Sequence, residues 1–267
     1  MIASFNSRVL LDIHETIFLD NRRKSIQRIF RFIYQNLSNN VIYHSNNTKI
    51  ELTKLGFKNK LIYVPHFHYS LKKSYSIDHV GFDLQNSISR ESINLLFFGN
   101  IRPSKGIYEL LSIIRSFNAK LHHCKLNFII AGQDIFNVLP KLILDHLPTS
   151  NFKILLRYVN DDEMCYLFSH VDYILLPYRE ISQSGILEVA FSFRKPIIAS
   201  KIKYFQEIID LHPSFGYTMD FLDQNAINHL VEIIENDKGD YYTDIDIKKY
   251  YKSEEFNNFI LKLRNKI

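Results

Sequence analysis

Two carboxylates, Glu180 and Glu188, flank a polar, glycine-containing turn that leads into an apolar run. A carboxylate near a helix start can accept hydrogen bonds from sugar or ribose hydroxyls, and the free backbone amides there can bind phosphate oxygens. The helix is predicted to start at Ser184 and Gly185, because an apolar stripe follows that consists of Ile186, Val189, Ala190 and Phe193. Glu188 lies off this stripe. Taken singly, Glu188 is equally explained by the helix dipole and Glu180 by an exposed loop.

Two cations follow another apolar segment, residues 93–99. Gly99 precedes Arg102 and Lys105 there, in the sequence FFGNIRPSKGIYEL. The glycine permits a tight turn, and the cations lie where the next helix presents unpaired N–H groups, which together suit a diphosphate. The alternative is a polar loop whose charges are only solvated.

Both groups of residues belong to one regular alternation of strands and helices. From residue 93 onward, short apolar segments alternate with helical patterns, which predicts a doubly wound α/β domain with a parallel sheet. The strands are predicted at 93–99, 125–132, 152–156, 171–177 and 195–200, and the helices at 104–117, at 136–147, after the capping pair Asn160 and Glu163, after Ser184, and at 203–211. Such sheets bind ligands at the carboxyl ends of their strands, where both groups fall.

The first part of the chain has a weaker pattern of the same kind. Strands are predicted at 8–13, 40–45 and 60–67, with a small helix at 46–56 that Gly56 ends, and residues 70–91 are polar and irregular. We therefore divide the chain into a partial N-terminal α/β domain (1–80), a linker (81–92), a C-terminal domain (93–252) and a C-terminal helix (253–267).

The composition is that of a globular chain, with 46% hydrophobic residues among 267. No apolar run reaches the ~18 residues of a membrane-spanning helix, and the N-terminus lacks the features of a secretion signal, so a cytoplasmic location is expected. Cys124 and Cys165 are expected to be reduced. The sequence HHCK at 122–125 has no second Cys/His cluster to complete a site, so no metal is expected.

The formal charge of +5 favours an anionic partner. Residues 21–37 predict a basic amphipathic helix, whose apolar face consists of Ile26, Ile29, Phe30 and Ile33. Such a helix can lie on an anionic membrane surface, and it can equally be a solvated helix docked on a sheet. It has no recognisable recognition motif for DNA or RNA, so no nucleic-acid partner is expected.

Three motifs together resemble family 4 of the retaining glycosyltransferases, which have the two-domain GT-B fold. They are G-x-x-R-x-x-K-G from Gly99, IIAG at 129–132, and E-x7-E-V-A from Glu180 followed by KPIIAS. The resemblance is close over residues 93 to about 210 and looser through LLDIHE, VIYHS and IYVPHF. One departure is EISQSG, where the family has EGFG.

The resemblance implies a role for each motif. Arg102 and Lys105 would hold the diphosphate of a nucleotide-sugar donor beside Gly99. Glu180 would contact the donor sugar, and Glu188 the ribose. Further donor contacts would come from backbone amides near the phosphate and from residues that border the base, namely Gln183, Ser184, Gly185, Tyr158 and Val159. A lone histidine is more often structural, but the resemblance gives equal weight to a role in which His14 would face the donor sugar from the N-terminal domain.

The implied activity is the retaining transfer of a hexose from a UDP- or GDP-sugar to a glycan or lipid-linked acceptor, in bacterial surface polysaccharide synthesis. No cofactor is expected, because the donor loops lack a D-x-D pair that would hold a metal diphosphate. Charge on the leaving group would instead be met by Arg102 and Lys105.

The N-terminal domain is expected to be shortened, since 80 residues are fewer than a typical domain of ~100–200. The chain is then expected to be poorly active alone, and to self-associate, to pair with a separate N-terminal chain, or to lie at the inner face of the membrane through residues 21–37. The helix 253–267 is expected to pack back on the N-terminal domain. The alternative function is a truncated, non-catalytic nucleotide-sugar-binding or partner subunit.

Overall fold

The chain folds into two compact units. The computed structural model describes residues 10–12, 32, 36, 40–44, 46–54, 56, 57, 61–63, 71, 73–117, 124–139, 151–181, 184–239 and 241–251. The larger unit consists of His68–Ile181 and Gly185–Ile247, and the smaller unit of Met1–Phe67, Ser182–Ser184 and Lys248–Ile267.

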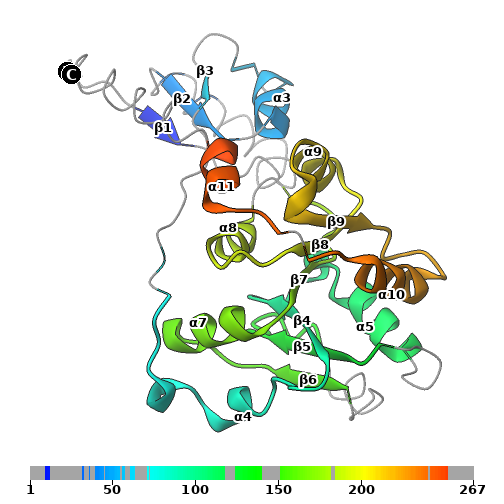
Figure 1. The fold of residues 1–267 in the computed structure, drawn as a ribbon. Coiled ribbons are helices and arrows are strands. Elements are labelled where there is room, and N and C mark those ends of the chain that lie inside the picture. The colour runs from blue at the N-terminus through cyan, green and yellow to red at the C-terminus, as the bar shows by residue number, and fades with distance from the viewer. Residues whose placement is uncertain are drawn as a thin grey trace. The chain divides into compact units, whose positions relative to one another are not determined.

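A six-stranded parallel sheet forms the centre of the larger unit. Its order is β6-β5-β4-β7-β8-β9 (Figure 1). The strands are β4 (Ile93–Phe98), β5 (Leu126–Ala131), β6 (Phe152–Leu155), β7 (Tyr173–Leu176), β8 (Ile197–Ser200) and β9 (Gly216–Met219). The chain moves outward from β4 to β6, returns to β7 beside β4, and moves outward again to β9. The order therefore reverses between β4 and β7, which is the switch point where doubly wound sheets bind ligands.

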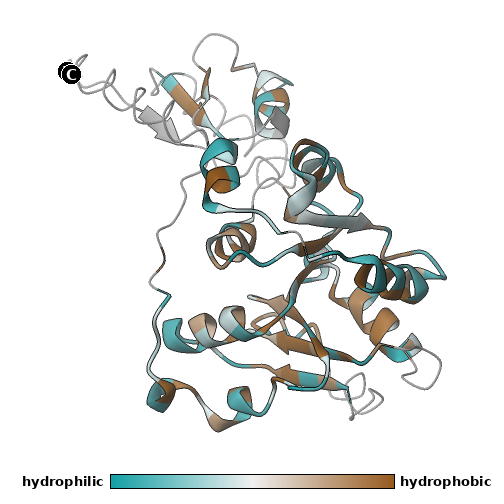
Figure 2. Cartoon of the chain, in the orientation of Figure 1, coloured by the Kyte–Doolittle hydropathy of each residue, from teal (hydrophilic) through white to brown (hydrophobic). Residues whose placement is uncertain are grey.

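The strands form because their sequences suit burial on both faces. Every residue of β5, β7 and β8 is buried, and Figure 2 shows β4 and β5 as predominantly hydrophobic. Continuous apolar runs of this kind are typical of parallel sheets covered by helices on both sides. The predicted doubly wound α/β fold is confirmed, and each predicted strand of this unit is present.

Helices cover both faces of this sheet. The helices α7 (Asp161–His170) and α8 (Gly185–Ser192) lie on one face, and α5 (Ile107–Ser116) and α10 (Ala226–Asn236) lie on the other (Figure 1). Two further helices are α9 (Lys203–Leu211) and α11 (Asp244–Tyr250). The predicted capping box is present at the start of α7, where the Asn160 side chain accepts from Glu163 N and the Glu163 side chain accepts from Asn160 N.

Residues 81–92, expected to be a linker, are packed within the larger unit. They follow the short 3-10 helix η1 (Ile77–His79) and contain α4 (Phe82–Gln85). Leu84 is fully buried, and the Gly81 amide donates to the Glu163 carboxylate. A single buried leucine and a few polar contacts give the sequence no hydrophobic periodicity, so the segment resembles a linker in the sequence.

The smaller unit contains a three-stranded parallel sheet of order β1-β2-β3. Its elements are β1 (Leu10–Asp12), β2 (Asn40–Tyr43), α3 (Asn46–Lys54) and β3 (Leu61–Tyr63), all within segments predicted as strand or helix. Val41, Tyr43, Leu52 and Phe57 form its small core. The predicted residue His14, the helix 253–267 and all but residues 32 and 36 of the predicted helix 21–37 lie outside the described residues.

Candidate functional site

Two glycines bring the carboxyl ends of β4 and β5 into close contact. Gly99 has φ +100° and Gly132 has φ +148°, and a Cβ on Gly132 would lie 2.1 Å from the Gly99 carbonyl oxygen. The Gly99 amide also donates to the Ala131 carbonyl at 2.9 Å. A larger residue at position 132 would therefore push the strand ends apart, whereas position 99 favours glycine because of its positive φ.

The loop after β4 rests directly on the loop after β7. It passes through the 3-10 helix η2 (Pro103–Lys105) into Gly106, which has φ +69°. A Cβ on Gly106 would lie 1.7 Å from the Pro177 carbonyl oxygen, and the Arg179 amide donates to the Ser104 carbonyl at 2.9 Å. The loops after β4 and β7, on either side of the switch point, are therefore packed against each other and joined by a backbone hydrogen bond.

Lys105 is the cation at the point where these two loops meet. Its Nζ lies 5.6 Å from the centroid of the buried Tyr178 ring and 3.1 Å from the position of a Cβ on Gly99. Burial, with a smaller contribution from the positive charge of Arg102, lowers the pKa of Lys105 to about 8. A partly desolvated ammonium at a switch point is suited to bind an anion, since a nearby negative charge would stabilise the protonated form that burial disfavours.

Arg102 extends the positive charge outward from Lys105. It is exposed, and its guanidinium lies 5.2 Å from the ring centroid of Phe136 in the loop after β5. Asp134 organises that loop, because its carboxylate accepts from the amides of Val138 and Leu139, each at 2.8 Å. Loops from β4, β5 and β7 thus contribute to one region.

Glu188 and Glu180 differ sharply in environment. Glu188 lies in the first turn of α8, is 1% exposed, and has its pKa raised to about 8 by burial. The prediction that it lies off the apolar face is wrong. The buried side of α8 carries Leu187, Ala190 and Phe191, whereas the predicted stripe members Ile186, Val189 and Phe193 are half-buried. Glu180 is exposed in the loop after β7, as predicted.

The other predicted donor contacts are distributed as follows. Ser184 is buried immediately before α8, and Gly185 is its first residue, so the helix start is predicted correctly. Ile186 of this helix lies close to the β4 end, since its Cδ1 is 3.4 Å from the position of a Cβ on Gly99. Gln183 lies outside the described residues.

Residues 83–252 match the family described as glycosyl transferases group 1. The chain belongs to this family. A Klebsiella pneumoniae relative, an uncharacterized 41.2 kDa protein in the cps region, is 25% identical over 183 residues, which are 66% of this chain and 47% of that protein. A GDP-mannose:glycolipid 4-beta-D-mannosyltransferase of Xanthomonas campestris is 29% identical over 106 residues, which are 39% of this chain and 29% of that enzyme. The chain thus spans less than half the length of these two relatives.

Solved structures of low identity share the fold. HepE from Anabaena in complex with UDP-glucose superposes with a TM-score of 0.74 at 14% identity, over 97% of this chain and 72% of that one. Sucrose-phosphate synthase from Thermosynechococcus elongatus gives a TM-score of 0.72 at 15% identity, over 98% of this chain and 68% of that one. The expected GT-B type of fold is therefore confirmed.

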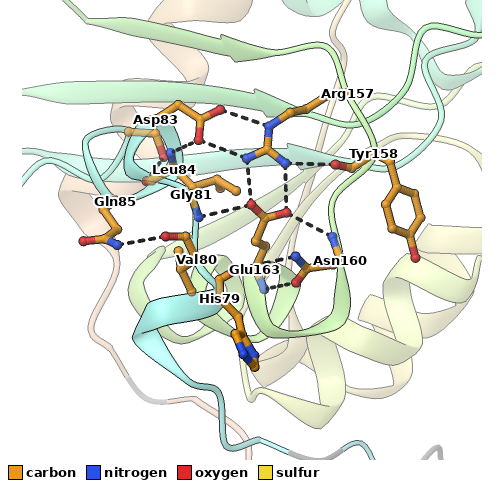
Figure 3. Close-up of polar contacts among 11 residues, drawn as sticks. His79, Val80, Gly81, Asp83, Leu84, Gln85, Arg157, Tyr158, Asn160 and Glu163 are labelled. Carbon is orange, nitrogen blue, oxygen red and sulfur yellow. Dashed lines mark hydrogen bonds and ion pairs between the residues drawn. The ribbon is translucent and has the colours of Figure 1, made fainter.

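In this member of the glycosyl transferases group 1 family, Tyr158 and Val159 lie on the loop between β6 and α7. A network centred on Arg157 holds this loop (Figure 3). The Arg157 guanidinium donates to both carboxylate oxygens of Glu163, at 2.7 and 2.8 Å, and to Asp83 at 3.0 Å. It also donates to the Tyr158 carbonyl at 2.9 Å, while the Tyr158 ring points away from the network and is 66% exposed.

Several polar contacts near the site are not indicated by the sequence. Arg157 and Asp83 pair across the larger unit, and Arg179 after β7 pairs with the buried Glu109 of α5 at 2.6 Å. The only sequence signal among these residues is the capping box, which identifies Glu163 but not its ion pair. Within the described part of the chain, no three His, Cys, Asp or Glu side chains cluster as metal ligands, and no helix is long and apolar enough to cross a membrane.

Proposed function

We propose that this chain binds a nucleotide-diphosphate sugar at the switch point of the larger unit and transfers its hexose to a glycan or lipid-linked acceptor. The observation that carries the proposal is the position of Lys105. Its partly desolvated ammonium lies where the loops after β4 and β7 meet, in a chain of the glycosyl transferases group 1 family. HepE was solved in complex with UDP-glucose, and the Xanthomonas enzyme is named for GDP-mannose, which supports a nucleotide-sugar donor.

In this proposal each residue has the role that the resemblance to the family implies. Arg102 and Lys105 bind the diphosphate, and they stabilise the charge that develops on it as the bond to the sugar breaks. The exposed Glu180 contacts the sugar, and the buried Glu188 contacts the ribose. We propose that the Ser184 and Gly185 amides bind phosphate oxygens, and that Tyr158 and Val159 border the base. These donor contacts need no metal ion.

Calorimetry of the whole chain with UDP, GDP and their sugars tests the binding step. Lys105→Met should weaken the nucleotide diphosphate by about 10–100-fold, since a charge-assisted contact contributes ~1.5–3 kcal/mol. Lys238→Met is the matched control, because Lys238 is exposed beyond the carboxyl end of α10. Absence of nucleotide binding by the unmodified chain, or equal affinities for both variants, would overturn the proposal.

A transfer assay tests the chemistry that the proposal assigns. Lipid-linked and soluble glycan acceptors are incubated with each nucleotide sugar, with Mg²⁺ or with EDTA, and product is expected in both conditions. Proton NMR of the new anomeric centre then decides the stereochemical course, for which we propose retention. Binding without transfer to any acceptor would favour the alternative function, a non-catalytic nucleotide-sugar-binding subunit.

A further inference from the structure

Glu109 is a carboxylate on the buried face of α5. Its side chain is 5% exposed, among apolar neighbours that include Leu110 and Ile113. One carboxylate oxygen, Oε1, accepts from Arg179 Nε at 2.6 Å. The other, Oε2, is buried and has no hydrogen-bond partner within the described residues. A buried carboxylate is costly unless it is paired, so the contact with Arg179 is the compensation that the structure provides.

Arg179 belongs to the point where the two loops of the proposed donor site join. Its amide donates to the Ser104 carbonyl at 2.9 Å, one residue before Lys105. The preceding carbonyl, that of Tyr178, accepts a short hydrogen bond from Ser200 Oγ at the end of β8. The backbone up to Arg179 is thus fixed from two sides, and Glu180 is the next residue.

The direction of the Arg179 side chain is not fixed by close packing. The ion pair lines a cavity of about 410 Å³ between α5, α10 and residues 221–224, and the Arg179 side chain is 51% exposed. There is room for other arginine rotamers in such a space. The charge and hydrogen bond of Glu109 therefore select the observed direction, in which Arg179 extends toward α5.

We propose that Glu109 and Arg179 are a positioning pair for Glu180. By anchoring Arg179 to α5, the helix that follows Lys105, the pair fixes the course of the chain at Glu180 relative to the ammonium that holds the diphosphate. The pair acts on the sugar step and leaves nucleotide binding intact. This inference rests on the proposed function, because it assigns the pair a role in presenting Glu180 to the donor sugar.

The first test separates nucleotide binding from the sugar step. In Arg179→Met and Glu109→Gln, affinity for the bare nucleotide should stay within about twofold, while kcat for sugar transfer or for hydrolysis of the nucleotide sugar should fall about 10–100-fold, as expected for a misplaced sugar contact. Ser112→Ala, which also lines the cavity, is the control and should retain both properties. An unchanged kcat, or equal losses of nucleotide affinity and turnover, would contradict the inference.

A double variant separates positioning from stability. Glu109→Leu with Arg179→Met replaces the ion pair by an apolar pair of similar volume, which is often neutral or stabilising for folding. It should melt at or above the temperature of the unmodified chain and still have the reduced kcat. Recovery of turnover together with stability would show that the pair is only structural.

A measurement on the free protein keeps this inference distinct from the proposed function. Hydrogen exchange of the Arg179 amide, which donates to the Ser104 carbonyl, should be about tenfold faster in the double variant, because the side-chain anchor of this loop on α5 is lost. Exchange at the unmodified rate would overturn the positioning role. If the unmodified chain binds no nucleotide, the proposed function fails, and the exchange rates still decide whether the pair fixes this loop.

Discussion

The ammonium of Lys105 lies over the ring of Tyr178, 5.6 Å from its centroid, so a cation that follows β4 rests on an aromatic ring that follows β7. The contact crosses the switch point of the sheet, where the strand order reverses. It places a positive charge over the negative face of an aromatic ring, which offsets part of the cost of its burial. The site thus has a charge that is costly to maintain without an anion.

That cost predicts that Lys105→Met stabilises the fold while it weakens nucleotide binding. The pKa of Lys105 is lowered from 10.5 to about 8. Between pH 8 and pH 10.5 the unfolded chain therefore binds more protons than the folded chain. The free energy of unfolding rises with pH across this window, and the gain is lost as the pH is lowered to 8. Lys105→Met should gain up to about 3 kcal/mol at pH 7 in urea unfolding. A less stable variant would contradict this account.

Glu188 predicts the opposite dependence on pH. Burial raises its pKa from 4.5 to about 8, so the folded chain binds more protons than the unfolded chain between these values. The stability that protonated Glu188 contributes is complete below pH 4.5 and is lost as the pH rises to 8, by about 4–5 kcal/mol. Glu188→Gln removes this titration. Urea unfolding from pH 5 to 8 should show a flatter profile for the variant, and parallel profiles would argue against a buried, protonated Glu188.

The surroundings of Gly106 require a glycine, whereas those of Gly185 do not. Gly106 has φ +69° and no space toward Pro177, whereas a Cβ on Gly185 would meet nothing within 4 Å in the described part of the chain. Gly106→Ala should therefore destabilise the chain by about 2–4 kcal/mol or displace the loop that carries Lys105. Gly185→Ala, in the first turn of α8, should be neutral or stabilising by up to about 1 kcal/mol. Thermal melting of both variants checks the contrast.

The sequence predicts the strands from residue 93 to residue 200 well, because each is mainly apolar. The predicted helix 136–147 lies mostly outside the described residues, and its first residues, 136–139, are not helical. The sequence contains no comparable signal for β9, whose four residues begin with Gly216 at φ +145°. A Cβ on that glycine would lie 2.0 Å from the Ile197 carbonyl oxygen, so its identity reflects packing against β8 rather than strand propensity.

The predicted site positions follow from the same topology, whereas their environments do not. Parallel strands place Gly99, Lys105 and Glu180 beyond the carboxyl ends of the two central strands, as expected. The burial of Glu188 depends on how α8 rotates against the sheet, which apolar spacing in eight residues leaves open. The ion pair of Arg179 with Glu109 joins residues 70 positions apart and leaves no local pattern.

The network around Arg157 predicts unequal roles for its two carboxylates. Glu163 is 5% exposed and accepts from Arg157, Asn160 and Gly81, whereas Asp83 is 49% exposed. Glu163→Ala should cost about 2–4 kcal/mol, because it removes the capping box and the two hydrogen bonds that the Arg157 guanidinium donates to Glu163, and Asp83→Ala should cost less than about 1 kcal/mol. The Arg157 hydrogen bonds lower the pKa of Glu163, so its contribution is lost as the pH falls below 4.5. If acid titrations show that the two variants lose equal free energy of unfolding relative to the unmodified chain, this ranking is refuted.

The division between Glu180 and Glu188 predicts different ligand dependence for two variants. Glu188 is buried in the first turn of α8 and is proposed to contact the ribose, so Glu188→Ala should weaken the bare nucleotide and its sugar conjugate by the same factor, about 10-fold for a lost hydrogen bond to a charged or protonated carboxyl group. Glu180 is exposed in the loop and is proposed to contact the sugar, so Glu180→Ala should spare the bare nucleotide.

The measurement is calorimetry with UDP, GDP and their sugars, followed by turnover of the nucleotide sugar that binds. Glu180→Ala should lower kcat for that donor by about 10²-fold while the affinity for the nucleotide stays unchanged, since only the sugar step loses a contact. Lys153→Met, an exposed change on β6, serves as a control for nonspecific effects of charge. Identical losses for nucleotide and nucleotide sugar in both glutamate variants would mean that the two carboxylates do not divide the donor between them.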